Sequence, residues 1–173
     1  GVILLEPSER ADFRYVHINS DGSIAGMCGN GSRAIAYFAH TLGITGSAMR
    51  FEIKGAVYRA RLDDARHVVT EFVPPQHMEP HLDVDPDAAR SGGFYHVGVP
   101  HLVLFCNDID SVELDRLGPY FRHHRSFPEG SNVDAVEIVD DHHIRVRTWE
   151  RGVEGETLAC GTGAVASALA GSI

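Results

Sequence analysis

An approximate internal repeat constrains the fold of this 173-residue chain more than any other feature of its sequence. One copy runs from Arg14 through a polar loop to Cys28-Gly29-Asn30-Gly31, and the other runs from Arg145 to Cys160-Gly161-Thr162-Gly163. Nearly the same number of positions separates the arginine from the cysteine in each copy. The pattern of each copy is typical of a strand, a glycine-containing loop and a helix. The sequence therefore predicts a duplicated half.

The rest of the pattern predicts an α+β fold with two pseudo-symmetric halves. We expect the N-terminal half at 1–73 and the C-terminal half at 74–173, because Pro74-Pro75-Gln76 restricts the backbone to extended conformations typical of a linker. The expected helices span 31–41 and 163–170. Ala34, Ile35, Phe38 and Leu42 recur at helical spacing in the first helix. The expected hairpins pair 49–62 with 66–73 and 133–139 with 142–149.

Charge and cysteine content narrow the class of protein. The formal net charge is −9, which argues against binding to a phosphate backbone. No apolar run approaches the length needed to span a bilayer, and the first residues show no basic leader, so neither a membrane segment nor a signal peptide is expected. The three cysteines do not form a secreted disulfide pattern, which favours a cytoplasmic location.

Neither a metal nor an organic cofactor is expected. No two cysteines have the spacing of a zinc site, and the neighbouring histidines His123-His124 and His142-His143 would face opposite sides of a strand. Pyridoxal phosphate needs a Schiff-base lysine. The only lysine, Lys54, lies in an alternating strand pattern without a glycine-rich phosphate loop nearby.

The two cysteines that precede the expected helices indicate acid–base chemistry. At a helix start, unpaired N–H groups and the helix dipole favour negative charge, which lowers a thiol pKa. The same N–H groups can hold a carboxylate. Cys28 and Cys160 could therefore remove a proton from one side of a carbon and return a proton on the other. The simpler interpretation, a buried structural cysteine, is preferred only for Cys106 in its apolar strand.

These motifs resemble those of the diaminopimelate epimerase family over most of the chain. The matching segments are Asn19-Ser20-Asp21-Gly22-Ser23, Met27 to Arg33, Glu150-Arg151-Gly152 and Glu156 to Gly163. The resemblance implies two halves that are each a mixed sheet wrapped around a central helix, with the active site between them. It also implies cofactor-independent conversion of LL-diaminopimelate to meso-diaminopimelate, in lysine and peptidoglycan precursor biosynthesis, by a homodimer.

The same resemblance assigns roles to particular residues. It implies that the catalytic residues are Cys28, Cys160, His101 and Glu150. It implies that the substrate-binding residues are Asn19, Gly29, Asn30, Asn132, Glu150, Arg151, Gly161 and Thr162, and that there is no metal ligand. The chain departs from the family at Val99, where many members have asparagine, and it lacks the family's first and last strands.

Three other functions are compatible with parts of the pattern. A proline or hydroxyproline racemase would use the same two-cysteine chemistry, but such enzymes typically carry histidine at the position of Asn30 and do not need the Glu150-Arg151 pair. The isomerases of phenazine synthesis lack the paired cysteines and fit poorly. A catalytically inactive thiol or ligand-binding fragment would also keep two cysteines at helix starts, but it would not exchange an amino-acid α-proton.

Overall fold

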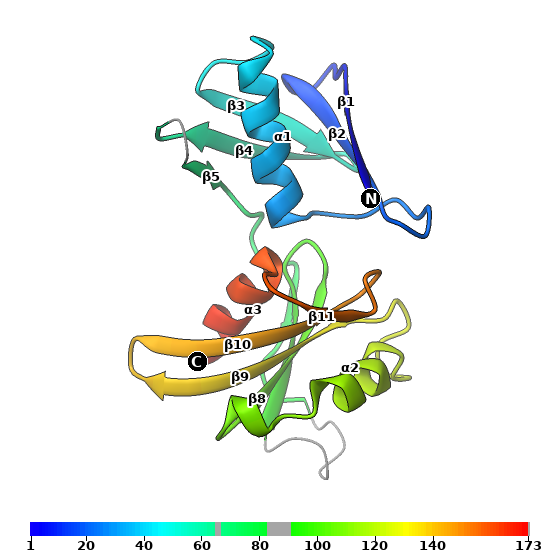
Figure 1. The fold of residues 1–173 in the computed structure, drawn as a ribbon, viewed down its shortest axis with the longest axis vertical. Coiled ribbons are helices and arrows are strands. Elements are labelled where there is room, and N and C mark those ends of the chain that lie inside the picture. The colour runs from blue at the N-terminus through cyan, green and yellow to red at the C-terminus, as the bar shows by residue number, and fades with distance from the viewer. Residues whose placement is uncertain (65–66, 83–90, 173) are drawn as a thin grey trace. The chain divides into compact units, whose positions relative to one another are not determined.

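The computed structural model describes residues 1–64, 67–82 and 91–172. The chain forms two compact units, Gly1–Val73 and Pro74–Ile173. Each unit has its own sheet and its own helix that begins at a cysteine (Figure 1). The expected α+β class is confirmed, because both sheets combine parallel and antiparallel pairs and helices are few.

The first unit is a five-stranded sheet with one helix. Its strands pair in chain order, antiparallel except for the parallel pair of β2 with β3. The helix α1 connects those two strands. The elements are β1 (Val2–Glu6), β2 (Phe13–Ile18), α1 (Gly29–Thr41), β3 (Ala48–Ile53), β4 (Ala56–Leu62) and β5 (Val68–Thr70).

The core of the first unit lies between α1 and the sheet. Aromatic side chains from three strands stack there: Phe51 lies 5.7 Å from Phe13 and 5.9 Å from Tyr58, ring centroid to centroid. Ile35 and two alanines of α1 pack on this cluster. Small helix residues let the helix approach a sheet whose large side chains fill the gap.

One expectation for this unit was wrong. The segment 49–62 is not one strand, because Lys54 (φ 46°) and Gly55 (φ 84°) form a tight turn between β3 and β4. Two successive residues with positive φ are typical of a two-residue hairpin turn whose twist matches that of the strands. Lys54 therefore lies in a turn rather than in a strand, and its Nζ donates a hydrogen bond to the Ile24 carbonyl.

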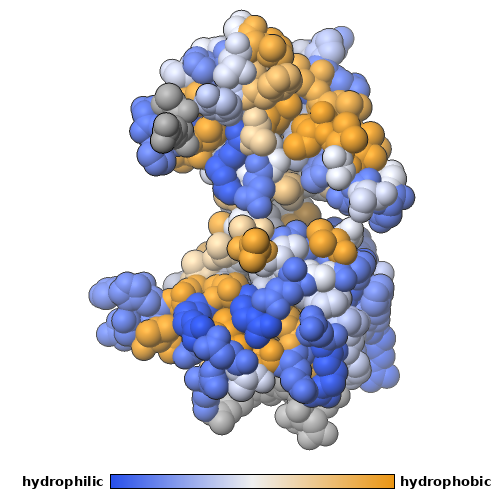
Figure 2. Space-filling view, in the orientation of Figure 1, coloured by the Kyte–Doolittle hydropathy of each residue, from blue (hydrophilic) through white to orange (hydrophobic). Residues whose placement is uncertain are grey.

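The buried face of α1 does not coincide with the apolar residues at helical spacing. Of the four apolar residues at helical spacing only Ile35 is buried, whereas Phe38 and Leu42 are 50% and 56% exposed. The helix buries its small residues instead, because the aromatic side chains of the sheet already fill the core volume. Figure 2 shows hydrophobic residues gathered on the surface of this unit. The expected helix itself is confirmed, although it begins at Gly29.

The second unit is a six-stranded sheet in the order β11-β10-β9-β8-β7-β6, in which only the β8–β9 pair is parallel. Its strands are β6 (His77–Glu79), β7 (Ser91–His96), β8 (Pro100–Cys106), β9 (Asn132–Asp140), β10 (His143–Glu150) and β11 (Gly155–Thr157). A 3-10 helix, η1 (Ile109–Ser111), and α2 (Leu114–Arg122) connect β8 to β9, and α3 (Gly161–Gly171) follows β11.

The two longer helices of this unit cover opposite faces of its sheet. Leu102 and Val133 pack with α2 residues, whereas the alternate positions Val103 and Val136 pack with α3 residues. Because side chains alternate along a strand, every second residue of β8, β9 and β10 faces α3. His101, Asp134 and Thr148 share this parity with Val103, Val136 and Val146 and therefore face α3.

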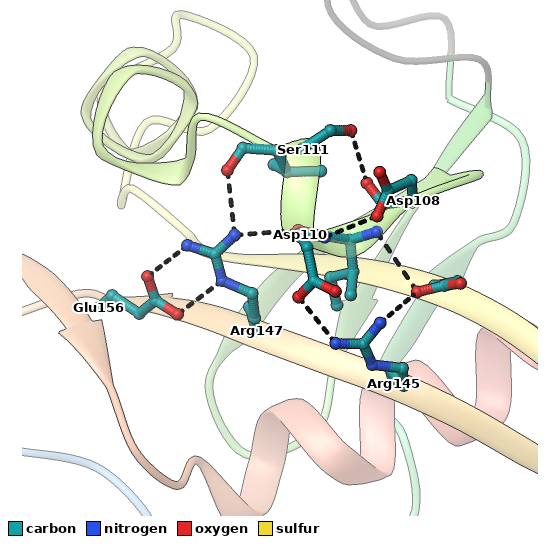
Figure 3. A network of polar contacts seen from close by, with 9 residues as sticks. Asp108, Asp110, Ser111, Arg145, Arg147 and Glu156 are labelled. Carbon is teal, nitrogen blue, oxygen red and sulfur yellow. Dashed lines mark hydrogen bonds and ion pairs between the residues drawn. The ribbon is translucent and has the colours of Figure 1, made fainter.

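A network of arginines and carboxylates joins η1 to the edge of this sheet (Figure 3). Arg147 forms a bidentate pair with Glu156, both N–O distances being 2.7 Å, and also donates to the carbonyl oxygens of Ile109 and Val112. Arg145 bridges Asp110 and Glu137. The network positions the start of β11, which leads into the loop before α3.

The predicted repeat appears as two matching sequences of elements. In the first unit the antiparallel pair β1–β2 precedes α1, and in the second the antiparallel pair β9–β10 precedes β11 and α3. Both helices begin directly after a cysteine. Among the described residues, no helix is both long enough and apolar enough to cross a membrane.

Candidate active site

The two cysteines adopt nearly the same geometry at the starts of their helices. Cys28 has φ −126° and ψ 114°, and Cys160 has φ −123° and ψ 108°. The Gly31 N–H donates to the Cys28 sulfur at 3.5 Å, and the Gly163 N–H donates to the Cys160 sulfur at 3.4 Å. Each sulfur therefore satisfies one of the N–H groups that a helix leaves unpaired in its first turn.

The surroundings of Cys160 contradict the expected lowering of its thiol pKa. The pKa is raised to about 12, first by burial and then by the negative charges of Glu150 and Asp134. A contact of 3.4 Å with the Thr162 hydroxyl and the Gly163 N–H act in the opposite direction but do not outweigh burial. The helix start alone therefore does not decide the ionisation of this thiol.

His101 lies inside the second unit with no exposed surface. Its Nδ1 is 2.6 Å from Oδ2 of Asp134, which is equally buried. The other oxygen of Asp134 accepts a hydrogen bond of 2.7 Å from Thr148. Both partners of the carboxylate thus lie on strands adjacent to β9, which gives the buried charge two hydrogen bonds.

Asn132 links His101 to Arg151. The Asn132 Oδ1 accepts from the backbone N–H of Arg151 at 2.8 Å, and its Nδ2 donates to the Pro100 carbonyl at 2.9 Å and lies 3.5 Å from His101 Nε2. The Arg151 guanidinium donates to the Glu129 carbonyl at 2.9 Å. Burial lowers the pKa of Arg151, and the neighbouring Arg122 has the same effect.

Glu150 and Thr162 are the remaining predicted site residues of the second unit whose side chains lie near Cys160. The Glu150 carboxylate accepts a 2.5 Å hydrogen bond from the Thr157 hydroxyl, so the short strand β11 holds it in place. Thr162 is buried in the first turn of α3, next to Gly161. The structure thus gathers Cys160 with Glu150 and Thr162 around one helix start.

The remaining predicted residues belong to the first unit. Gly29 and Asn30 open α1, and the Asn30 side chain accepts a hydrogen bond from Arg33. Asn19 lies in the loop after β2, where it donates to the Ser23 hydroxyl at 3.0 Å and its backbone N–H to the Ser23 carbonyl at 2.8 Å. This closed loop leads from β2 towards Cys28.

Two buried residues near the cysteines were missed by sequence reasoning. Asp134 lies between Val133 and Ala135, two positions after Asn132, which was a usable signal, because alternation puts Asn132 and Asp134 on one face. Tyr15 carries a buried hydroxyl with no hydrogen-bond partner among the described atoms, and burial raises its pKa, as does the charge of Cys28. No feature of the sequence distinguishes Tyr15 from an ordinary core tyrosine.

The described residues contain no metal-ligand cluster, and one cavity of the first unit lies away from the predicted site residues. Within residues 1–64, 67–82 and 91–172, no three His, Cys, Asp or Glu side chains are arranged to hold a metal ion. A cavity of about 340 Å³ lies on β3, β4 and β5 of the first unit, lined by Arg50, Arg59 and Arg61 among others. It contains none of the predicted site residues.

Comparison with solved structures identifies the fold. A hydroxyproline epimerase from Agrobacterium vitis matches with a TM-score of 0.72 at 16% identity, covering 98% of this chain and 58% of that one. A phenazine biosynthesis protein of the PhzF family from Bacillus anthracis matches with a TM-score of 0.70 at 14% identity, covering 94% and 62%. The chain thus has the α+β fold that these two proteins share.

Sequence comparison identifies the family within that fold. The diaminopimelate epimerase family model matches residues 94–173. The diaminopimelate epimerase of Aquifex aeolicus is 44% identical and that of Chlorobaculum tepidum 42% identical, each over 98% of this chain. The chain belongs to the diaminopimelate epimerase family. It covers 62% and 66% of the lengths of these two relatives.

Proposed function

We propose that this chain carries the two acid–base cysteines of an isomerase that converts LL-diaminopimelate to meso-diaminopimelate without a cofactor, in lysine and peptidoglycan precursor biosynthesis. One observation carries the proposal. Cys28 and Cys160 cap their helices with nearly identical backbone angles and with the same N–H donor position, three residues on. Membership of the family supplies the substrate class.

The reaction needs a base and an acid on opposite sides of the α-carbon. One cysteine, as thiolate, accepts the α-proton, and the other, as thiol, donates a proton to the opposite face of the resulting carbanion. One proton leaves the substrate and one returns, so the configuration inverts without a net redox change. The main barrier is the low acidity of the α-carbon, which a preorganised, water-poor site lowers by stabilising negative charge on the carboxylate.

The two helix starts supply groups suited to the substrate carboxylates. Gly29-Asn30 and Gly161-Thr162 occupy the first turns of α1 and α3, where the backbone N–H groups and the positive end of the helix dipole favour a bound anion. A glycine directly after each cysteine lets a carboxylate approach the backbone closely. We assign these four residues to carboxylate binding.

The other predicted residues suit the amino groups and the distal end of the substrate. Glu150 offers a carboxylate to an ammonium group, and Arg151 offers a cation to the second carboxylate. Asn19 lies in the first unit's loop before Cys28 and can donate from its amide. Asn132 uses both amide atoms inside the unit, so we assign it the task of holding Arg151 and His101.

The free cysteines support a reducing location. All three are unpaired, as is usual in the cytoplasm. We propose that the protein acts in the cytoplasm as a homodimer on a small-molecule substrate, and that its negative charge leaves no role for nucleic acid or membranes.

The proposal is tested by α-proton exchange in deuterated water, followed by NMR with reduced protein and diaminopimelate. Because the chain is shorter than its relatives, the same assay is run on a version extended by the terminal segments of the Aquifex aeolicus relative. Cys28→Ala and Cys160→Ala variants are the matched controls, and Cys106→Ala removes a thiol that caps no helix. Proline serves as the second substrate.

Loss of exchange in the Cys28 and Cys160 variants, but not in the Cys106 variant, would support the two-cysteine epimerase. Exchange with proline rather than diaminopimelate would replace it by a racemase of the same fold. If neither substrate shows α-proton exchange, in the extended protein as well, only a thiol or ligand-binding role would remain.

A further inference from the structure

The two helix starts share their backbone geometry but not the residues beneath them. In the first unit, a methyl group built on Gly31 would meet the Tyr15 hydroxyl and Cδ1 of Ile3. In the second, a methyl group built on Gly163 would lie 2.6 Å from Oδ1 of Asp134 and 2.9 Å from Oγ1 of Thr148. Ile3 on β1 and Asp134 on β9 thus hold corresponding places, an apolar side chain in one copy and a carboxylate in the other.

Asp134 lies close to Cys160 as well as to Gly163. The same methyl position on Gly163 is 3.3 Å from Cβ of Cys160, so the carboxylate and the cysteine flank one glycine. Asp134 has no exposed surface. A buried charge is poorly screened, so it acts strongly on a thiol at this range.

Hydrogen bonds fix which ring nitrogen of His101 carries the proton. The Arg151 N–H points at the Asn132 amide oxygen, which turns the Asn132 NH2 group towards the Pro100 carbonyl and towards Nε2 of His101. Nε2 therefore faces a donor and presents its lone pair. The ring proton is on Nδ1, where it is donated to Asp134 at 2.6 Å.

The strands packed on α3 carry the titratable groups closest to this helix. Asp134 on β9 and Glu150 on β10 are carboxylates that oppose ionisation of the thiol, after burial itself. Thr162 on α3 favours ionisation. On β8, His101 directs its proton to Asp134, and on β7 Tyr95 is buried and neutral, because burial raises its pKa.

The residues near Cys28 differ from those near Cys160. Beneath Gly31 lie an isoleucine and a hydroxyl that keeps its proton, because burial and the charge of Cys28 both raise the pKa of Tyr15. A protonated hydroxyl with no other partner among the described atoms is suited to stabilise a thiolate, whereas a carboxylate is not.

We propose that Asp134 is a positioning residue that makes the surroundings of the two cysteines unequal: its buried carboxylate orients His101 through Nδ1 and keeps Cys160 as the proton-carrying thiol. The catalytic meaning of this inequality rests on the proposed function. The effect of Asp134 on the ionisation of Cys160 involves the second unit alone and can be measured without catalytic turnover.

The test is the pH dependence of thiol alkylation, measured for each cysteine by mass spectrometry after brief iodoacetamide treatment. Asp134→Asn removes the charge but keeps an oxygen that can accept from His101. We expect the midpoint for Cys160 to fall by about one pH unit, which is about a tenfold faster reaction below the midpoint. Cys106 on the same sheet is the internal reference, because burial, Glu137 and Asp108, rather than Asp134, raise the pKa of its thiol.

Thr148→Val is the matched control, because it removes one hydrogen bond to Asp134 but leaves the charge. Its Cys160 midpoint should stay near that of the wild type. A Cys160 midpoint that does not move in Asp134→Asn would overturn the proposal. So would an equal shift at Cys106, which would indicate general loosening of the unit.

Nitrogen chemical shifts of labelled His101 provide the second measurement. We expect a protonated Nδ1 and a free lone pair on Nε2 in the wild type at pH 8, and the opposite tautomer would overturn the orienting role. The failures are distinguishable. Shifted alkylation with no α-proton exchange would refute the proposed function alone, whereas exchange with unshifted alkylation would refute only the role of Asp134.

Discussion

At the scale of single residues, the second glycine of each motif decides what can lie under the cysteine. Gly163 has a buried carboxylate and a hydroxyl against its Cα, closer than any Cβ would allow. Glycine is therefore required there for space rather than for backbone conformation. The Asp134 carboxylate occupies that space, next to the start of α3.

Gly163→Ala should consequently destabilise the protein. The new methyl group would lie 2.6 Å from Oδ1 of Asp134, and relieving that clash should cost about 1–3 kcal/mol in the free energy of unfolding, more than the helix gains from alanine. Gly171→Ala in the same helix is the control, because its nearest neighbour is 3.8 Å away, at Ile144. Urea denaturation of both variants measures the difference, and equal stabilities would contradict this account.

The sequence was sufficient to identify the two cysteines, because a repeated Cys-Gly-x-Gly motif is visible without a structure. It was not sufficient for Asp134 or Tyr15. Their importance comes from cross-strand register and from contacts with Gly163 and Gly31, which a linear pattern does not contain. The expected low thiol pKa of Cys160 failed for the same reason, since burial and two carboxylates come from other elements.

At the scale of secondary-structure elements, Arg147 fastens η1 and β11 to β10 (Figure 3). It donates to the Ile109 and Val112 carbonyls, each of which also accepts from a backbone N–H, and it holds Glu156 with two bonds. Arg145 on the same strand is more exposed and pairs with two carboxylates. The two arginines thus look alike in sequence but differ in exposure and in the groups that they bind.

Arg147→Met should therefore destabilise more than Arg145→Met. Loss of Arg147 leaves the Ile109 and Val112 carbonyls without this donor. We expect the free energy of unfolding to fall by about 2 kcal/mol. Exposed pairs such as those of Arg145 contribute less than about 1 kcal/mol. Chemical denaturation of both variants at neutral pH checks the order, and a larger effect at Arg145 would refute it.

The same pair predicts a pH dependence. The hydrogen bond with Arg147 lowers the pKa of Glu156 in the folded protein, so the pair stabilises the fold above the unfolded-state pKa of about 4.3. That stability is lost as the pH falls through the lower, folded-state pKa. The difference in unfolding free energy between the wild type and Glu156→Gln should therefore shrink between pH 6 and pH 3, roughly the acid range of a carboxylate. A constant difference would show that the pair is not responsible.

At the scale of the whole molecule, each hydrophobic core cluster of the described residues lies within one unit. The first unit is built around Phe13, Phe51 and Tyr58, and the second around residues such as Leu102 and Val133. The strand and helix pattern predicted two similar halves, but it could not predict that the large apolar residues of α1 are exposed, because burial depends on what the sheet already supplies.

Core substitutions should thus act on the unit that contains them. Phe51→Ala is expected to cost about 3–5 kcal/mol and Leu102→Ala about 2–5 kcal/mol, because both side chains have no exposed surface. Native-state hydrogen exchange should show faster exchange in β3 and β4 for the first variant and in β8 and β9 for the second. Loss of protection throughout the chain in either variant would mean that the units unfold together.

The difference between Ile3 and Asp134 also bears on how many protons the cysteine pair holds. When two independent thiols have the same affinity for protons, at most about half of all molecules carry one proton on the pair, whatever the pH. The others carry two protons or none and cannot begin a one-proton exchange. Two copies of one motif would be limited in this way as long as they stayed identical. Under the proposed function, a carboxylate beneath one copy separates the proton affinities of the two thiols, so that nearly every molecule would hold one proton on the pair over a range of pH.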